Sequence, residues 1–85
     1  MLEKKFTVKN KHGLHLRPAT EFIKITACFK GEVYLAKGDV EVNAKSILGL
    51  LTLGIDYEDE VIIRCTGEGE DDFIRNLQEF FNKEE

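Results

Sequence analysis

The stretch FTVKNKHGLHLRPATEFIKITA (Phe6–Ala27) changes its hydrophobic period partway along, and this change predicts the first two elements of the fold. Its first residues alternate between apolar and polar side chains, which is typical of a strand near residues 2–8. Gly13 marks a turn. From Leu16 onward the apolar spacing is that of one helical face, and Pro18 favours a helix start close by, because proline is tolerated in the first turn. The predicted inner face comprises Ala19, Phe22, Ile23, Thr26 and Ala27.

The middle of the chain predicts a β-hairpin and a short helix. Two short alternating runs flank the sequence KGD at 37–39, where Gly38 can supply the positive φ of a hairpin turn. The apolar positions of these runs are Val33, Leu35, Val40 and Val42. Ser46 is a good N-cap and Gly54 a good C′ residue, so a helix of about two turns fits between them.

The last third of the chain adds a strand and an amphipathic helix. Val61, Ile63 and Cys65 alternate with polar residues, and the acidic sequence TGEGEDD then places carboxylates where the dipole of a following helix favours them. The apolar stripe of that helix comprises Phe73, Ile74, Leu77, Phe80 and Phe81. The predicted order is β-α-β-β-α-β-α, an α+β fold with one antiparallel sheet and helices on a single face.

Length, composition and charge restrict the class of protein. With 85 residues, 42% hydrophobic and 33% charged, the chain suits one globular domain spanning residues 1–85. The net charge of −4 and the absence of basic runs argue against nucleic-acid binding. No apolar run suits a membrane span or a signal peptide, so we expect a cytoplasmic protein. Cys28 and Cys65 lie far apart among apolar neighbours, and we expect two small buried side chains rather than a disulfide or a metal pair.

His15 and Arg17 stand at the expected start of the first helix. If His15 is the N-cap, the free N–H groups of the first turn and the helix dipole make an anion site beside its ring. Arg17 adds a forked, charged donor. The same positive field disfavours imidazolium and keeps the ring neutral and nucleophilic. The pair therefore suits a histidine that accepts and passes on a phosphoryl group, although a surface histidine or an ordinary cap would look the same.

His12 raises a second question about the same stretch. The spacing His12-x-x-His15 is compatible with a metal pair, but the two rings lie in a turn and no third ligand is near in sequence, so we expect no metal. His12 can lie beside His15 and screen an incoming phosphate, or it can be a solvated turn residue.

Two motifs resemble the signatures of one family. GLHLRPAT (13–20) resembles the active-site signature of HPr, the histidine-containing phosphocarrier of the bacterial phosphoenolpyruvate–sugar phosphotransferase system (PTS). NAKSILGLLTLG (43–54) resembles the second signature of that family, which is built around a regulatory serine. Length, element order and motif separation agree over essentially the whole chain. The fold implied is the open-faced β-sandwich, a four-stranded antiparallel sheet with three helices on one side.

The resemblance implies roles for the first motif. His15 would be phosphorylated on Nδ1 by enzyme I, with phosphoenolpyruvate as the ultimate donor, and would pass the group to the A domains of sugar permeases. Arg17 would stabilise the phosphate and Pro18 would fix the helix start. Leu16 would support the phosphate beside them, and so would His12 if its ring lies beside His15. His12 departs from the small polar residue that is usual in the family.

The second motif predicts a docking helix and its regulation. The segment after Ser46 is apolar nearly all round, which fits either a fully buried helix or a partly exposed partner site. By resemblance, the docking surface comprises Leu16, Thr20, Lys24, Ile47, Leu48, Leu51 and Thr52. Ser46 would be phosphorylated by HPr kinase/phosphorylase, and a catabolite-control transcription factor would be a further partner. A phosphate there suits the helix dipole but opposes apolar docking.

The sequence is also compatible with two other functions. A regulatory paralogue of the same fold would signal or bind a transcription factor and would support little sugar transport. Retention of His15 with Arg17 argues against a paralogue that has lost its active histidine, but it does not exclude a regulatory branch fed by a different enzyme I. A small ligand- or metal-binding module is the alternative from another class. An enzyme in the strict sense is not expected, because one nucleophile with one arginine describes a carrier that acts with partner proteins. We expect a monomer without cofactors.

Overall fold

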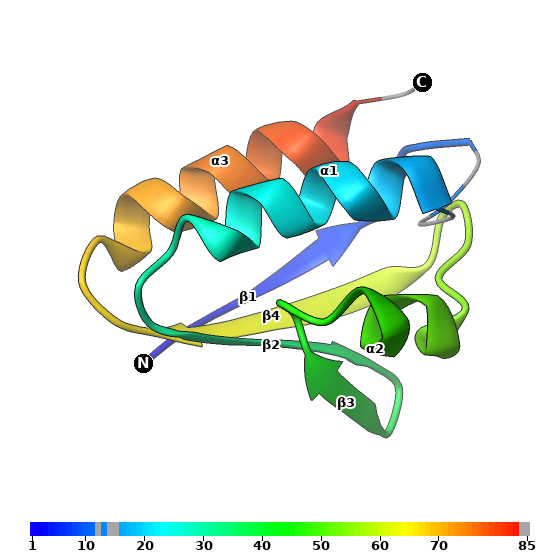
Figure 1. Cartoon of the computed structure of the whole chain (residues 1–85). Coiled ribbons are helices and arrows are strands. Elements are labelled where there is room, and N and C mark those ends of the chain that lie inside the picture. The colour runs from blue at the N-terminus through cyan, green and yellow to red at the C-terminus, as the bar shows by residue number, and fades with distance from the viewer. Residues whose placement is uncertain (12, 14–15, 84–85) are drawn as a thin grey trace.

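Seven helices and strands follow one another in the predicted order (Figure 1). The computed structural model describes residues 1–11, 13 and 16–83, with Leu16 described by its backbone alone. The elements are β1 (Leu2–Thr7), α1 (Leu16–Ala27), β2 (Glu32–Lys37), β3 (Val40–Asn43), α2 (Ile47–Leu53), β4 (Glu60–Thr66) and α3 (Glu70–Asn82). Within these residues, no helix combines the length and the apolar character that crossing a bilayer requires.

The four strands form one antiparallel sheet in the order β1-β4-β2-β3. The three helices lie on one face of this sheet (Figure 1), as the pattern predicted. The register places inward-facing residues opposite one another: Phe6 pairs with Val61, and Leu35 pairs with both Ile63 and Val42. Because side chains alternate along a strand, this register directs a continuous apolar layer toward the helices.

Aromatic contacts join the helices to the sheet and to the α1–β2 connection. Phe81 of α3 stacks on Phe6 of β1 with ring centroids 4.9 Å apart, and Phe73 stacks on Phe29 at 4.4 Å. Phe22 of α1 also meets Phe81 at 5.8 Å. The core thus closes between α1, α3 and the sheet, and these pairs contribute beyond their buried area. The core residues are Phe6, Val8, Ala19, Phe22, Phe29, Val33, Leu35, Ala44, Leu50, Ile55, Val61, Ile63, Cys65, Phe73, Ile74, Leu77 and Phe81.

The outward face of the sheet carries ion pairs. Arg64 of β4 reaches Glu41 of β3 at 3.0 Å and lies 3.9 Å from Glu3 of β1. Lys5 lies 3.8 Å from Glu60 on the neighbouring strand. These side chains stand on the face opposite the helices, because they alternate with core residues of the same strands.

The end of α1 departs from the sequence expectation. Ala27 and Cys28 are exposed, whereas the periodicity placed Ala27 on the inner face and composition predicted a buried Cys28. The helix ends at Ala27 and the chain then turns toward β2. The apolar pattern of the sequence therefore extends beyond the part of α1 that packs on the core. Cys65 is buried as predicted, and burial raises the pKa of its thiol.

Candidate functional site

The first helix begins at Leu16, where the sequence predicted it. Arg17 is exposed and Pro18 is half-buried, and both lie in the first turn, where backbone N–H groups have no partner within the helix. Pro18 suits this place because its missing N–H removes no helical hydrogen bond there. His12, His15 and the side chain of Leu16 lie outside the described residues. The N-cap role of His15 therefore stays a prediction.

Gly13 lies buried against the connection between α2 and β4. Its φ is +65°, a conformation that favours glycine, and its N–H donates to the carbonyl of Asn10 at 3.0 Å. An added Cβ would collide with the carbonyl oxygen of Ile55 and would lie 2.8 Å from Cα of Asp56. The sequence predicted a turn at Gly13 but not its close packing against the backbone of Ile55 and Asp56. Residues 55–56 are therefore the surface on which Gly13 packs.

One lysine contacts both ends of the connection after α2. Nζ of Lys37 lies 2.7 Å from Oδ2 of Asp59 and donates to the carbonyl of Gly54 at 2.8 Å. Oδ2 of Asp59 also accepts from the N–H of Asp56 at 2.8 Å. The hydrogen bond from Lys37 and then that from Asp56 hold the pKa of Asp59 below its ordinary value. No local motif predicts the contacts of Lys37, because Lys37 lies far from both Gly54 and Asp59 in the sequence.

Ser46 caps α2 as predicted. It has extended φ and ψ of −104° and 116°, and its Oγ accepts from the N–H of Gly49 at 3.2 Å. At the other end, Gly54 adopts the left-handed conformation with φ 63° and donates to the carbonyl of Leu51 at 3.3 Å. Capping of this kind defines both ends of a helix that is too short to persist by itself.

One face of α2 is buried and the opposite face is open. Leu50 is fully buried, Leu48 is 75% exposed and Leu51 is 39% exposed. Ile47 is half-buried, and the hydroxyl of the exposed Thr52 donates to the carbonyl of Leu48 at 2.7 Å. Of the two interpretations that the apolar sequence allowed, the partly exposed patch is therefore the one that the structure contains. Contiguous exposed apolar patches, rather than single exposed apolar residues, are typical of partner surfaces, and Leu48 and Leu51 are neighbours at a spacing of three residues on this helix.

The residues before α2 fix the place of Ser46. The ammonium of Lys45 donates to the carbonyl of Phe29, just after α1, at 2.6 Å, and the N–H of Lys45 donates to Oδ1 of Asn43 at 2.8 Å. A Cβ at Gly49 would lie 3.2 Å from Cβ of Val42, so α2 packs closely on β3. The bonds of Lys45 before Ser46 and the close packing of Gly49 after it therefore fix the position of Ser46.

Arg17, Thr20 and Lys24 lie on one exposed face of α1, because their spacing of three and four residues brings them onto one side of a helix. Helix α1 packs against α2, so the exposed residues of the two helices stand on neighbouring elements. The structure therefore places the described residues of the predicted docking surface on two adjoining helices.

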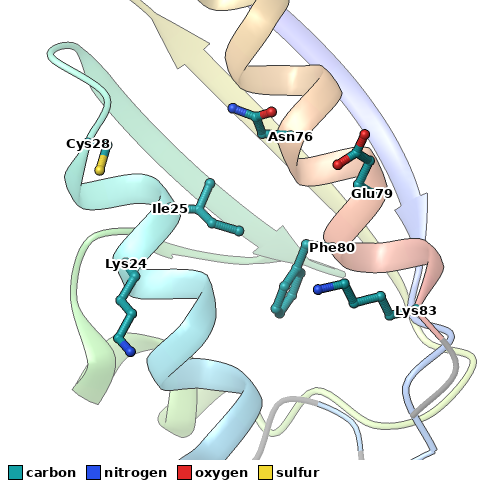
Figure 2. A pocket seen from close by; sticks show the side chains of 7 residues that line it. All are labelled: Lys24, Ile25, Cys28, Asn76, Glu79, Phe80 and Lys83. Atoms are coloured by element: carbon teal, nitrogen blue, oxygen red, sulfur yellow. The ribbon is translucent and has the colours of Figure 1, made fainter.

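A shallow hollow of about 390 Å³ lies between α1 and α3 (Figure 2). Lys24, Ile25 and Cys28 line it on the α1 side, and Asn76, Glu79, Phe80 and Lys83 line it on the α3 side. Of these residues, only Lys24 belongs to the surface that the sequence predicted. The exposed Cys28 borders this hollow, directly after the last residue of α1.

Comparison with known proteins supplies the family. The model of the family described as "PTS HPr component phosphorylation site" matches residues 2–83. The HPr-like protein Crh of Bacillus subtilis (strain 168) is 36% identical over 84 residues, which is 99% of each chain.

Solved structures agree with this match. The crystal structure of a phosphocarrier protein HPr from Bacillus anthracis str. Ames gives a TM-score of 0.90 at 28% identity, covering 95% of this chain and 96% of that one. The crystal structure of Bacillus subtilis Crh, described as a dimer with a swapped domain, gives 0.76 at 36% identity and covers 99% and 97%. The predicted open-faced β-sandwich is thereby confirmed. The chain belongs to the HPr family.

Proposed function

We propose that this protein is a phosphocarrier of the PTS, with His15 as the residue that carries the phosphoryl group. The match of residues 2–83 to the HPr phosphorylation-site family is the observation that carries this proposal. A ring nitrogen of His15 attacks the phosphorus held by phospho-enzyme I. A phosphorus–nitrogen bond forms on His15 as the bond to enzyme I breaks. The second transfer, to a sugar-permease A domain, repeats this exchange with His15 as the donor.

The residues around His15 supply charge and position in this proposal. Arg17 is exposed at the helix start, so its guanidinium is available to a phosphate beside the first turn. Pro18 and Leu16 set where the helix begins, and the N–H groups of that turn attract an anion. His12 would screen the phosphate when protonated. Positioning and charge stabilisation are the main contributions a protein makes to phosphoryl transfer, so no cofactor or metal is proposed.

Partner proteins would dock on the exposed faces of α1 and α2. The surface proposed comprises Leu16, Thr20, Lys24, Ile47, Leu48, Leu51 and Thr52. Support comes from Leu48, which is 75% exposed although it is a large apolar side chain on a short, well-capped helix. Burial of such side chains is the main source of affinity in protein association, so enzyme I and permease domains would share this surface.

A regulatory role is the second candidate function, and the similarity to Crh, named an HPr-like protein, supports it. In this version a kinase phosphorylates Ser46, and the modified protein binds a catabolite-control transcription factor in place of PTS partners. The hydroxyl of Ser46 lies at the N-terminus of α2, where the helix dipole favours a phosphate. The two functions are compatible in one chain, since they use different phosphorylation sites.

We also propose that residues 1–85 form a single domain that acts as a cytoplasmic monomer. The apolar core shared by the sheet and all three helices supports the single domain. The Bacillus subtilis Crh structure is described as a swapped dimer, so light scattering after size exclusion is the measurement for the oligomeric state. A concentration-independent monomer mass is expected, and a stable dimer at working concentration would contradict it.

Intact-mass analysis tests the phosphocarrier function. The protein is incubated with purified enzyme I and phosphoenolpyruvate, beside His15→Ala and Ser46→Ala. One added phosphoryl group is expected in the wild type and in Ser46→Ala, absent from His15→Ala and lost in acid. No addition with any enzyme I would contradict the proposal. Incubation with HPr kinase/phosphorylase and ATP tests the regulatory function, and it should add an acid-stable phosphate that Ser46→Ala abolishes.

A further inference from the structure

We propose that Lys37 is a positioning residue for phosphoryl transfer. It acts through its ion pair with Asp59, which fixes the residues 55–56 on which Gly13 packs. The inference rests on the proposed function of His15. It concerns residues that lie outside both sequence motifs, in the hairpin and in the connection that follows α2.

Lys37 stands at the end of β2 and closes the α2–β4 connection at both of its ends. Its ammonium contacts Oδ2 of Asp59 at 2.7 Å and the carbonyl oxygen of Gly54 at 2.8 Å. The two side chains are 33% and 28% exposed, which makes this the least exposed ion pair between side chains in the described part of the chain. Partial burial strengthens such a pair, because water screens it less.

The connection is also fastened to the end of β1. The N–H of Val8 donates to the carbonyl of Asp59 at 2.9 Å, and the N–H of Glu58 donates to the carbonyl of Val8 at 2.8 Å. Asp59 further donates its N–H to the carbonyl of Asp56 at 3.1 Å. The chain adopts a left-handed conformation at Glu58, with φ 71°. A non-glycine residue holds that conformation only where its surroundings fix it.

Gly13 rests on the segment that these contacts fix. Ile55 is 2% exposed, and the space beside its carbonyl oxygen is too narrow for any side chain at position 13. Gly13 precedes His15 by two residues in the sequence. Any displacement of residues 55–56 therefore changes the surface on which Gly13 packs.

Loss of the Lys37 ammonium leaves the carboxylate of Asp59 without its ion pair and the carbonyl of Gly54 without this donor. Lys37 donates no hydrogen bond to the exposed residues of α2 in the described part of the chain, because its bond in this region goes to the carbonyl of Gly54, just after the helix. We therefore expect a lower kcat for transfer from phospho-enzyme I at an unchanged KM. A misplacement of about 1 Å can cost about 100-fold in rate, and a decrease of at least about tenfold is expected here.

The experiment measures kcat and KM for phosphoryl uptake from phospho-enzyme I by the wild type, Lys37→Met, Lys37→Arg and Asp59→Asn. Lys5→Met is the matched control, because it removes a lysine from an exposed ion pair on the opposite face of the sheet. Lys37→Met and Asp59→Asn should lower kcat at least about tenfold, Lys37→Arg should restore most of it, and Lys5→Met should match the wild type. Urea denaturation confirms that each variant is folded, and Asp59→Asn carries the test if Lys37→Met is not.

The outcomes separate the two proposals. If the wild type accepts no phosphoryl group, the proposed function fails. If the wild type is active and folded Lys37→Met or Asp59→Asn has the same kcat, the positioning role of Lys37 is wrong while the phosphocarrier function stands. A rise in KM alone would also overturn it, because Lys37 would then act in docking. The His15 ring signals in NMR spectra give a second readout, and they should shift in Lys37→Met but not in Lys5→Met.

Discussion

The hydroxyl of Thr26, which is fully buried in α1, donates to the carbonyl oxygen of Ala44 at 3.1 Å. It also lies 3.2 Å from the carbonyl of Ile23 within its own helix. Ala44 connects β3 to the loop that presents Ser46, and its own N–H donates to Val33 of β2 at 2.9 Å. A single buried hydroxyl thus joins the helix of the first motif to the loop of the second.

Thr26→Val should lower the free energy of unfolding by about 1–3 kcal/mol, because it keeps the shape of the side chain but leaves the buried carbonyl of Ala44 without this donor. Urea denaturation measures the change. Thr52→Val is the control, since the hydroxyl of Thr52 is exposed, and its change should stay within about 0.5 kcal/mol. Equal effects of the two substitutions would show that the buried hydrogen bond contributes little.

Ser46→Asp should leave the fold intact but slow phosphorylation of His15. A fixed negative charge suits the start of α2 yet must lose its hydration when a partner covers the apolar residues beside it. A loss of roughly 2–3 kcal/mol of affinity corresponds to more than tenfold weaker docking. Ser46→Ala removes the cap without adding charge, so it should cost about 1 kcal/mol of stability and leave the transfer rate unchanged. A rate in Ser46→Asp equal to the wild type would refute this account of regulation.

Leu50→Ala should lower the stability of the protein, whereas Leu48→Ala should weaken partner docking. Leu50 is fully buried, so its truncation leaves a cavity and should cost about 2–5 kcal/mol. Leu48 is largely in water, so its truncation should change stability by no more than about 0.5 kcal/mol. It should nevertheless raise the KM for phospho-enzyme I. Calorimetric melting of both variants measures the change in stability, and transfer kinetics measure the KM. An unchanged KM in Leu48→Ala would exclude that side chain from the docking surface.

Glu58→Gly should be more stable than Glu58→Ala. Both substitutions remove the same carboxylate, but the φ of 71° disfavours any residue with a Cβ by about 1 kcal/mol. The difference between the two variants therefore reports the backbone strain relieved in the folded state, less the conformational entropy that glycine adds to the unfolded chain. Denaturant midpoints measured side by side provide the test. Equal midpoints would mean that the chain relaxes around position 58.

Acid should weaken the protein partly through Asp59. Lys37 holds the pKa of Asp59 in the folded state below the ordinary value of 3.8, so ionised Asp59 contributes stability that is fully present above that value. This contribution is lost as the pH falls through the folded pKa. Asp59→Asn should therefore be less stable than the wild type near neutral pH, and the two should converge below pH 3.8. A constant difference across the acid range, in urea titrations at several pH values, would contradict the linkage.

Local sequence signals predicted the helices and strands of this fold, and they predicted the caps at both ends of α2. Alternation gave the strands, helical spacing gave α1 and α3, and the pair Ser46 and Gly54 marked both ends of α2 within one residue. The same spacing indicated that α2 has more apolar residues than one buried face can hold, and Leu48 is indeed exposed. These features were predictable because each depends on residues within a turn or two of one another.

Contacts between distant parts of the chain could not be predicted in this way. The pairing of Lys37 with Asp59 and the packing of Gly13 on Ile55 depend on how the sheet and the connections meet in space. The strand order and the exposure of Cys28 have the same origin. The roles of His15 and Arg17 came from helix-start chemistry together with the family resemblance, and they remain predictions to be tested by transfer experiments.

The sheet order has a consequence for biosynthesis. Strand β1 pairs with β4 alone, and β4 is the last strand to be made. A nascent chain that has not reached Glu60 therefore contains the β2–β3 ladder but no partner for its first strand. The ring of Phe6 is also covered by Phe81, which lies near the end of α3. The complete sheet and its cover can therefore form only after α3 has emerged from the ribosome, and a translation product that ends before β4 would leave β1 without its partner strand.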